Sequence, residues 1–251
     1  MSEHCVLCGL PVSRAHMKQT LEDILARIRQ KKGAWVVTLN TEMLARLARE
    51  PSYHDLLSQA DIITADGMPL VWASRFKGPD QAIPERTTGV DLVDAYLRLP
   101  NIPAYAVIGG VDPAATLARY GESAVRACQY LFDGRVDLSA EQVQQFADAL
   151  LEKQVRMAFL ALGGKKQDQL AFMLKKAVPG LVVSGIGGSF EILGPKGSRA
   201  PQWMQNAGLE WLFRLTREPG RLWRRYLVYY PAGLGLLLRD CFKPQAQASR
   251  H

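Results

Sequence analysis

Short apolar runs alternate along the chain with longer segments whose apolar residues recur every three or four positions. The short runs predict strands and the longer segments predict helices. The expected strands span residues 34–39, 62–65, 104–108, 157–162 and 181–186, and the expected helices span 16–31, 41–49, 89–97, 112–127, 139–154 and 167–177. Ser139 followed by Gln142 predicts a capping box at one helix start. Strands that alternate with helices in this way form a parallel sheet covered on both faces, so the pattern predicts an α/β fold.

Small or polar residues follow each of the five expected strands. They are Thr38 and Asn40, then Asp66, then Gly109 and Gly110, then Gly163 and Gly164 with Gln167, and finally Gly187 and Gly188. Ligands of such sheets bind beyond the carboxyl ends of the strands. The sequence therefore predicts a ligand site formed by these residues.

Two of these strand ends have two interpretations each. Asp66, between Ala65 and Gly67, is either the N-cap of a following helix or a general base that a ligand can approach closely beside glycine. The turn at 185–188 resembles half of a dinucleotide-binding fingerprint, which needs a third glycine and an acidic residue about 20 positions later. A turn whose backbone amides face a phosphate or a sugar is favoured.

The segment from Arg86 to Asp91 precedes a predicted amphipathic helix. Thr87 or Thr88 can cap this helix, and Asp91 in its first turn is favoured by the helix dipole. Arg86, just ahead of the helix, is a candidate anion contact.

Charge divides the chain into a body (residues 1–195) and a tail (residues 196–251). The body holds equal numbers of basic and acidic residues, so the net charge of +7 lies in the tail. Arginines recur there at helical spacing, Arg214, Arg221 and Arg224 among them, with tryptophans and tyrosines interleaved. A solvated basic face is one interpretation, but the aromatic residues favour contact with an anionic membrane surface. We expect an α/β catalytic domain followed by a helical, membrane-associating appendage.

Several function classes lack their sequence signals. No secretory signal precedes residue 18, and no apolar run reaches the length of about 18 residues that a membrane-spanning helix needs. Cys5 and Cys8 have the spacing of a metal or redox pair, but His4 and His16 complete no common zinc site, so reduced thiols at a frayed N-terminus are favoured. Asp-x-Asp, Gly-x-Ser-x-Gly, His-Glu-x-x-His and Walker motifs are absent from the sequence. The missing Asp-x-Asp argues against the common metal-dependent design for sugar-nucleotide transfer.

Six ordered motifs resemble those of the WecG/TagA/CpsF family of bacterial glycosyltransferases, from about Gly9 to Tyr226. They are Thr38-Leu39-Asn40, Ala65-Asp66-Gly67, Arg86-Thr87-Thr88-Gly89-Val90-Asp91, Leu162-Gly163 with Lys166-Gln167, the GIGGSF run at 185–190, and Arg199-Ala200-Pro201 with Trp203, followed by Gly208-Leu209-Glu210-Trp211. The resemblance implies a Rossmann-like α/β domain with a helical C-terminal appendage. It also implies inverting transfer of a sugar from a UDP-sugar to a polyprenyl-diphosphate-linked acceptor sugar, without a metal or other cofactor. The reaction would serve surface polysaccharide synthesis, on the inner face of the cytoplasmic membrane.

The resemblance also assigns expected roles to residues. Asp66 falls on the general base, while Thr38, Asn40, Arg86 and Gln167 fall on pocket positions, Arg214, Arg221 and Arg224 on appendage arginines, and Tyr130 on a contact to the nucleotide base. We add Asp91, Gly187 and Gly188 as substrate-binding candidates, and we expect no metal ligands. Lys165-Lys166-Gln167-Asp168 departs from the usual Pro-Lys-Gln-Glu, and Phe190-Glu191 departs from the usual Phe-Asp.

The donor remains open among N-acetylmannosamine, its uronic acid, glucose and glucuronic acid. Two other classes are alternatives at this stage. The glycine turns alone suggest a nucleotide-binding oxidoreductase, and the basic, Trp-rich tail suggests nucleic-acid binding. The neutral body argues against nucleic acid as a partner, and a homo-oligomer is compatible with the sequence.

Overall fold

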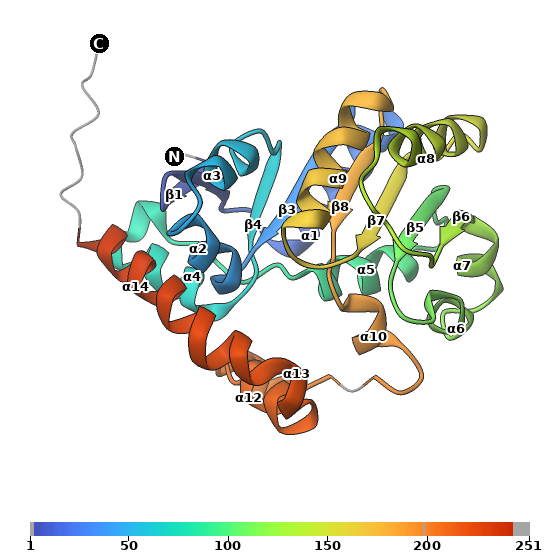
Figure 1. Cartoon of the computed structure of the whole chain (residues 1–251). Helices are drawn as coiled ribbons and strands as arrows, with labels where there is room; N and C mark the ends of the chain where they lie inside the picture. Colours follow the sequence, from blue (N-terminus) through green and yellow to red (C-terminus); the bar gives the residue numbers. More distant parts are fainter. Residues whose placement is uncertain (1–2, 198, 243–251) are drawn as a thin grey trace, which may run out of the picture.

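Six parallel strands form the central sheet of the computed structural model, which describes residues 3–197 and 199–242 (Figure 1). The strands are β3 (Ala34–Leu39), β4 (Ile62–Ala65), β5 (Tyr105–Gly109), β6 (Cys128–Phe132), β7 (Met157–Ala161) and β8 (Val182–Gly185). Their order across the sheet is β4-β3-β8-β7-β5-β6. The predicted α/β fold with a parallel sheet is confirmed.

Helices cover both faces of this sheet (Figure 1). The helices of the body are α1 (Met17–Arg29), α2 (Thr41–Leu47), α3 (Pro51–Leu57), α4 (Met68–Phe76), α5 (Gly89–Leu97), α6 (Pro113–Ala118), α7 (Glu122–Ala127), α8 (Ala140–Glu152), α9 (Gly164–Ala177) and α10 (Ser189–Leu193). Helices α1 and α5 pack in one apolar cluster, and α3, α8 and α9 pack in another.

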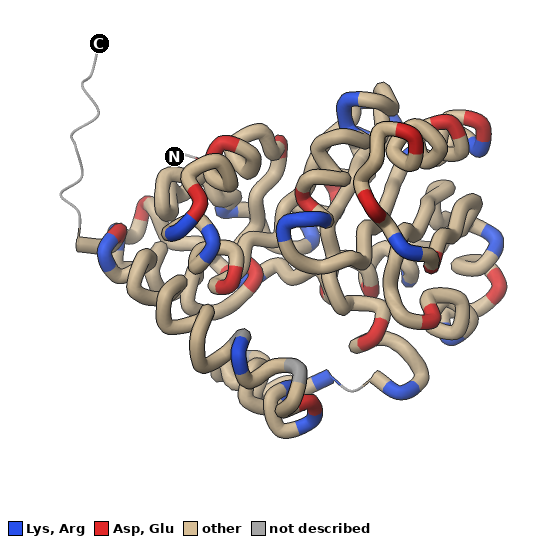
Figure 2. The backbone as a smooth tube through the Cα atoms, viewed as in Figure 1, with Lys and Arg blue, Asp and Glu red and all other residues tan. Residues whose placement is uncertain are grey.

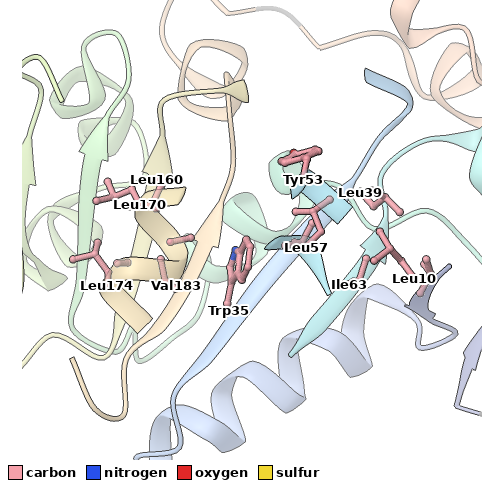
Figure 3. Close-up of a cluster of buried hydrophobic side chains, with 14 of the residues drawn as sticks. Leu10, Trp35, Leu39, Tyr53, Leu57, Ile63, Leu160, Leu170, Leu174 and Val183 are labelled. Atoms are coloured by element: carbon pink, nitrogen blue, oxygen red, sulfur yellow. The ribbon is translucent and has the colours of Figure 1, made fainter. Parts of the chain in front are cut away.

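Alternate residues of each central strand enter different clusters. Trp35 belongs to the same cluster as Leu57 of α3 and Leu174 of α9, which Figure 3 shows, whereas Val36 belongs to the cluster on the other face with Ile24 of α1. Successive strand side chains point to opposite faces. Because both faces are buried, the strand reads in the sequence as an unbroken apolar run.

Two elements differ from the sequence-based expectation on the β5 side of the sheet. The single helix expected over 112–127 is two helices: α6 ends at Ala118, and α7 begins after its N-cap residue Gly121, whose φ of 90° interrupts the helical backbone. Strand β6 was not predicted, because its side chains are only partly buried or exposed at the sheet edge and form no apolar run.

The N-terminus is a packed hairpin, so the expectation of a frayed segment is wrong. Strands β1 (His4–Leu7) and β2 (Leu10–Ser13) pair antiparallel, and Cys5 is fully buried in the core. Burial raises the pKa of the Cys5 thiol to about 11, which keeps it protonated at neutral pH.

The described part of the tail folds back on the body. It contains α11 (Gln202–Asn206), α12 (Glu210–Arg217), α13 (Pro219–Arg224), a π-helical turn (Arg225–Tyr229) and α14 (Tyr230–Cys241). Helix α14 lies along α2 and α4 (Figure 1). The Asp240 carboxylate accepts a hydrogen bond from the Cys8 backbone N–H at 2.9 Å and pairs with Lys77 Nζ at 2.8 Å. Within residues 3–197 and 199–242, no helix has both the length and the apolar character needed to cross a bilayer.

Candidate active site

A cavity of about 1000 Å³ opens at the carboxyl end of the sheet, between the body and the tail. Ligand pockets commonly measure about 300–1000 Å³, so this cavity lies at the upper end of that range. The predicted site residues that line it are Thr38, Asn40, Asp66, Arg86, Gln167, Gly187, Gly188, Arg214 and Arg224. The fold therefore brings residues from four strand ends to one space, and the tail adds two arginines.

Asp66 lies directly beyond β4 and its side chain is partly buried. Its backbone N–H donates to the Leu39 carbonyl at 2.7 Å, which holds the residue against the end of β3. Gly67, with a φ of 133°, is the N-cap residue of α4. Asp66 is therefore not the N-cap residue itself, and it lines the cavity.

Thr38 and Asn40 flank the end of β3. Thr38 is 7% exposed, and the Asn40 Oδ1 accepts from the Met43 backbone N–H at 3.0 Å as the N-cap of α2. The side-chain oxygen of Asn40 thus accepts a hydrogen bond from the backbone of α2. This bond fixes the orientation of the carboxamide in the cavity lining.

Gln167, in the first turn of α9, connects two glycine turns. Its Oε1 accepts from the backbone N–H of Gly187 at 2.9 Å and of Gly163 at 3.3 Å. A Cβ at Gly185 would collide with the Gln167 side chain, so only glycine permits this approach. The Gly187 N–H already has an acceptor, so this amide does not serve a ligand phosphate in the present arrangement.

Asp168 is a buried carboxyl group that the sequence did not predict as a site residue. It is 3% exposed, lines the cavity together with Tyr53 of α3, and accepts a hydrogen bond from the Tyr53 hydroxyl at 2.6 Å. Burial raises the pKa of Asp168 to about 7, against the opposing effect of the Tyr53 hydrogen bond. The pair joins α3 to the first turn of α9, beside Gln167.

Arg86 connects the body to the tail. Its Nη1 donates to Glu210 Oε2 at 2.7 Å and its Nη2 donates to Gln205 Oε1 at 3.0 Å. The Arg86 and Glu210 side chains are each 16% exposed. The guanidinium that we expected to contact an anion therefore has two protein partners in this structure.

Asp91 and Tyr130 do not line the cavity, and neither do Gly109 and Gly110, which end and follow β5. The Asp91 carboxylate accepts from Thr88 Oγ1 at 2.7 Å and pairs with Arg199, so its contacts hold the start of α5 and the start of the tail. Tyr130 lies on β6, the edge strand, where its ring packs 6.4 Å from that of Phe146.

Two arginines of the tail line the cavity, and one of them approaches the glycine turn. Arg214 of α12 approaches Gly188, with its Nη2 3.8 Å from the position that a Cβ would occupy there. Arg224 of α13 lies over the Trp223 ring at 5.3 Å. The side chain of Arg221, the third predicted arginine, lies outside the described part of the structure.

Aromatic residues of the tail also line the cavity. The Trp211 ring lies 5.7 Å from Tyr226, and Tyr226 lies 4.9 Å from Tyr230. Tryptophans and tyrosines are interleaved with the tail arginines in the sequence, but this pattern did not indicate that these three line the same cavity as Asp66.

The described residues offer no cluster of three or more His, Cys, Asp or Glu side chains placed to hold a metal ion. The Cys5 and Cys8 pair lies in the β1–β2 hairpin, away from the cavity.

Comparison with known proteins gives the family. The sequence model of the glycosyl transferase WecG/TagA/CpsF family matches residues 5–247. A relative from Bacillus spizizenii (strain ATCC 23059 / NRRL B-14472 / W23), the N-acetylglucosaminyldiphosphoundecaprenol N-acetyl-beta-D-mannosaminyltransferase, is 29% identical over 214 residues, which cover 85% of this chain and 80% of the relative. The chain belongs to the WecG/TagA/CpsF family of glycosyltransferases.

Proposed function

We propose that this glycosyltransferase moves N-acetylmannosamine, or a closely related sugar, from a UDP-sugar to a saccharide linked to a polyprenyl diphosphate. The observation that carries the proposal is that Asp66 lines a large cavity together with Arg214 and Arg224 of the tail. The B. spizizenii relative, named for transfer of N-acetylmannosamine to an N-acetylglucosaminyl lipid diphosphate, supports this choice of donor and acceptor. Family membership favours sugar transfer over nicotinamide oxidation or nucleic-acid binding.

Asp66 is the proposed general base. Its carboxylate takes the proton from the acceptor hydroxyl, whose oxygen attacks the anomeric carbon of the donor. The bond from that carbon to the UDP oxygen breaks, and the bonding pair leaves with UDP. A single displacement of this kind inverts the anomeric configuration.

The departing diphosphate needs compensating positive charge. Arg214 and Arg224 supply it from the tail, where they face the cavity from α12 and α13. Fixed cations in a site of low water content stabilise developing charge strongly. Transfer in this scheme needs no metal or other cofactor.

The tail also supplies the proposed membrane contact. Trp203, Trp223 and Leu227 are 64%, 44% and 64% exposed, and basic residues surround them in the sequence. Exposed aromatics beside basic side chains favour the interface of an anionic membrane. We place the enzyme on the inner face of the bacterial cytoplasmic membrane, peripherally bound, where the lipid-linked acceptor is available for surface polysaccharide synthesis.

Asp66→Asn tests the proposal in a UDP-release assay with UDP-N-acetylmannosamine and a polyprenyl-diphosphate-linked N-acetylglucosamine. Loss of a general base lowers turnover by about 10²–10⁴-fold, while calorimetric binding of the UDP-sugar should persist. Asp23→Asn, on the exposed face of α1, is the matched control. Near-normal turnover by Asp66→Asn would remove this residue from the mechanism.

A further inference from the structure

Two apolar stripes border one end of the cavity. The stripe on α4 consists of Trp72 and Phe76, which are four residues apart. The stripe along α14 and its C-cap consists of Leu234, Leu238 and Phe242, also spaced four residues apart. Residues four apart lie on one face of a helix. Phe76, Leu238 and Phe242 are 81%, 58% and 84% exposed. All five residues line the cavity that contains Asp66.

The two stripes run side by side, away from Asp66. Helix α4 begins at Met68, two residues after Asp66, and ends where Lys77 pairs with Asp240 of α14 at 2.8 Å. Near the same end, the Cys241 Sγ contacts the Ala73 carbonyl oxygen at 3.7 Å. Leu234 and Phe242 are eight residues apart, so the α14 stripe extends for about 12 Å at the helical rise.

The cavity changes character along this direction. Elsewhere the lining holds both acidic and basic residues, Arg214 and Arg224 of the tail among them, whereas the residues of α4 and α14 that line it carry no charge. Figure 2 shows α14 free of charged residues except at its carboxyl end, where Arg239 and Asp240 lie. Exposed apolar surface of this kind, continuous with a polar site that contains arginines, fits a ligand with an anionic head and a hydrocarbon chain.

We propose that the groove between α4 and α14 binds the first isoprenyl units of the acceptor's polyprenyl chain. The inference rests on the proposed function. The acceptor diphosphate then lies at the inner end of the groove, and the saccharide hydroxyl reaches Asp66. The continuity of the groove with the site of chemistry favours the lipid chain of the substrate over bulk membrane lipid or a second copy of this protein.

The test compares two acceptors in the same detergent. Both carry N-acetylglucosamine diphosphate, one on a long polyprenyl chain and one on a single isoprenyl unit. We expect the wild-type protein to prefer the long-chain acceptor, measured as the ratio of the two kcat/KM values. Phe76→Gln and Leu238→Gln should each lower this ratio about tenfold, as expected for lost apolar contacts in a binding site. Both side chains are exposed, so folding should tolerate the changes.

Leu151→Gln provides the matched control, because Leu151 is 46% exposed on α8 and does not line the cavity. This variant should keep the wild-type ratio. A ratio near one for the wild type, or equal losses with both acceptors in Phe76→Gln and Leu238→Gln, would overturn the proposed groove. Weaker sedimentation of these variants with anionic vesicles, at an unchanged ratio in detergent, would assign the stripes to membrane contact instead. If the wild type transferred sugar to neither acceptor, the proposed function itself would fail.

Discussion

Gly233 of α14 allows the tail to pack against the body, and its replacement by alanine should displace this helix. A Cβ at Gly233 would overlap the backbone carbonyl oxygen of Thr41 and lie 2.9 Å from the Thr41 Cγ2. Gly235, two residues later in the same helix, has no atom within 4 Å of the corresponding position. The two glycines therefore differ in packing while sharing the same helical backbone.

The expected change in the free energy of unfolding follows from two opposing effects. Alanine in place of a helical glycine stabilises a helix by about 0.5–1 kcal/mol. Overpacking a close contact costs about 1–3 kcal/mol, and the upper value applies to Gly233 because its neighbour is backbone that cannot rotate away. We expect Gly233→Ala to lower the free energy of unfolding by about 2 kcal/mol. Gly235→Ala should raise it by up to about 1 kcal/mol.

Urea unfolding measures both changes, and amide hydrogen exchange along 230–241 reports whether α14 leaves its position. Sugar transfer should fall with Gly233→Ala, because α14 lines the cavity. Equal stability and equal amide protection in the two variants would refute the reasoning that close approach of α14 to Thr41 holds the tail in place.

Three further predictions concern the site. Glu210→Gln leaves the mostly buried Arg86 guanidinium without its ion pair, and urea unfolding should show a loss of about 1–3 kcal/mol; an unchanged midpoint would contradict a stabilising role for this contact. Gln167→Met removes the acceptor shared by the Gly163 and Gly187 amides and should lower kcat/KM, whereas Gln167→Glu keeps an acceptor oxygen and should retain more activity than Gln167→Met. Asp168 has a folded-state pKa of about 7, above the unfolded value of about 3.9, so folding takes up a proton. The stability that it contributes is greatest below about pH 4 and is lost as the pH rises toward 7. Asp168→Asn should remove that part of the pH dependence, and an identical pH profile for the two proteins would contradict the shifted pKa.

Local patterns in the sequence determined five of the six strands of the sheet, all except the edge strand β6. Strands β3 and β4 begin and end where the apolar runs predicted, because residues buried on both faces leave an unbroken signal. The Ser139 Oγ accepts from the Gln142 N–H at 3.2 Å as predicted, although the Gln142 side chain accepts from Asp137 instead of completing the capping box. These features depend on neighbours in the chain, which is why the sequence alone sufficed.

Only the tertiary structure decided how the tail completes the site. Arg86 and Glu210 are 124 residues apart, and Tyr53 and Asp168 are 115 apart, so no local period links either pair. For the same reason, local patterns did not show that Tyr130 lies on an edge strand away from the cavity. They also did not show that Gln167 accepts hydrogen bonds from two separate turns. Periodicity reports which residues share a face of one helix or strand. Which faces meet depends on packing between distant elements, and here that packing joins the polar part of the cavity to the apolar groove between α4 and α14.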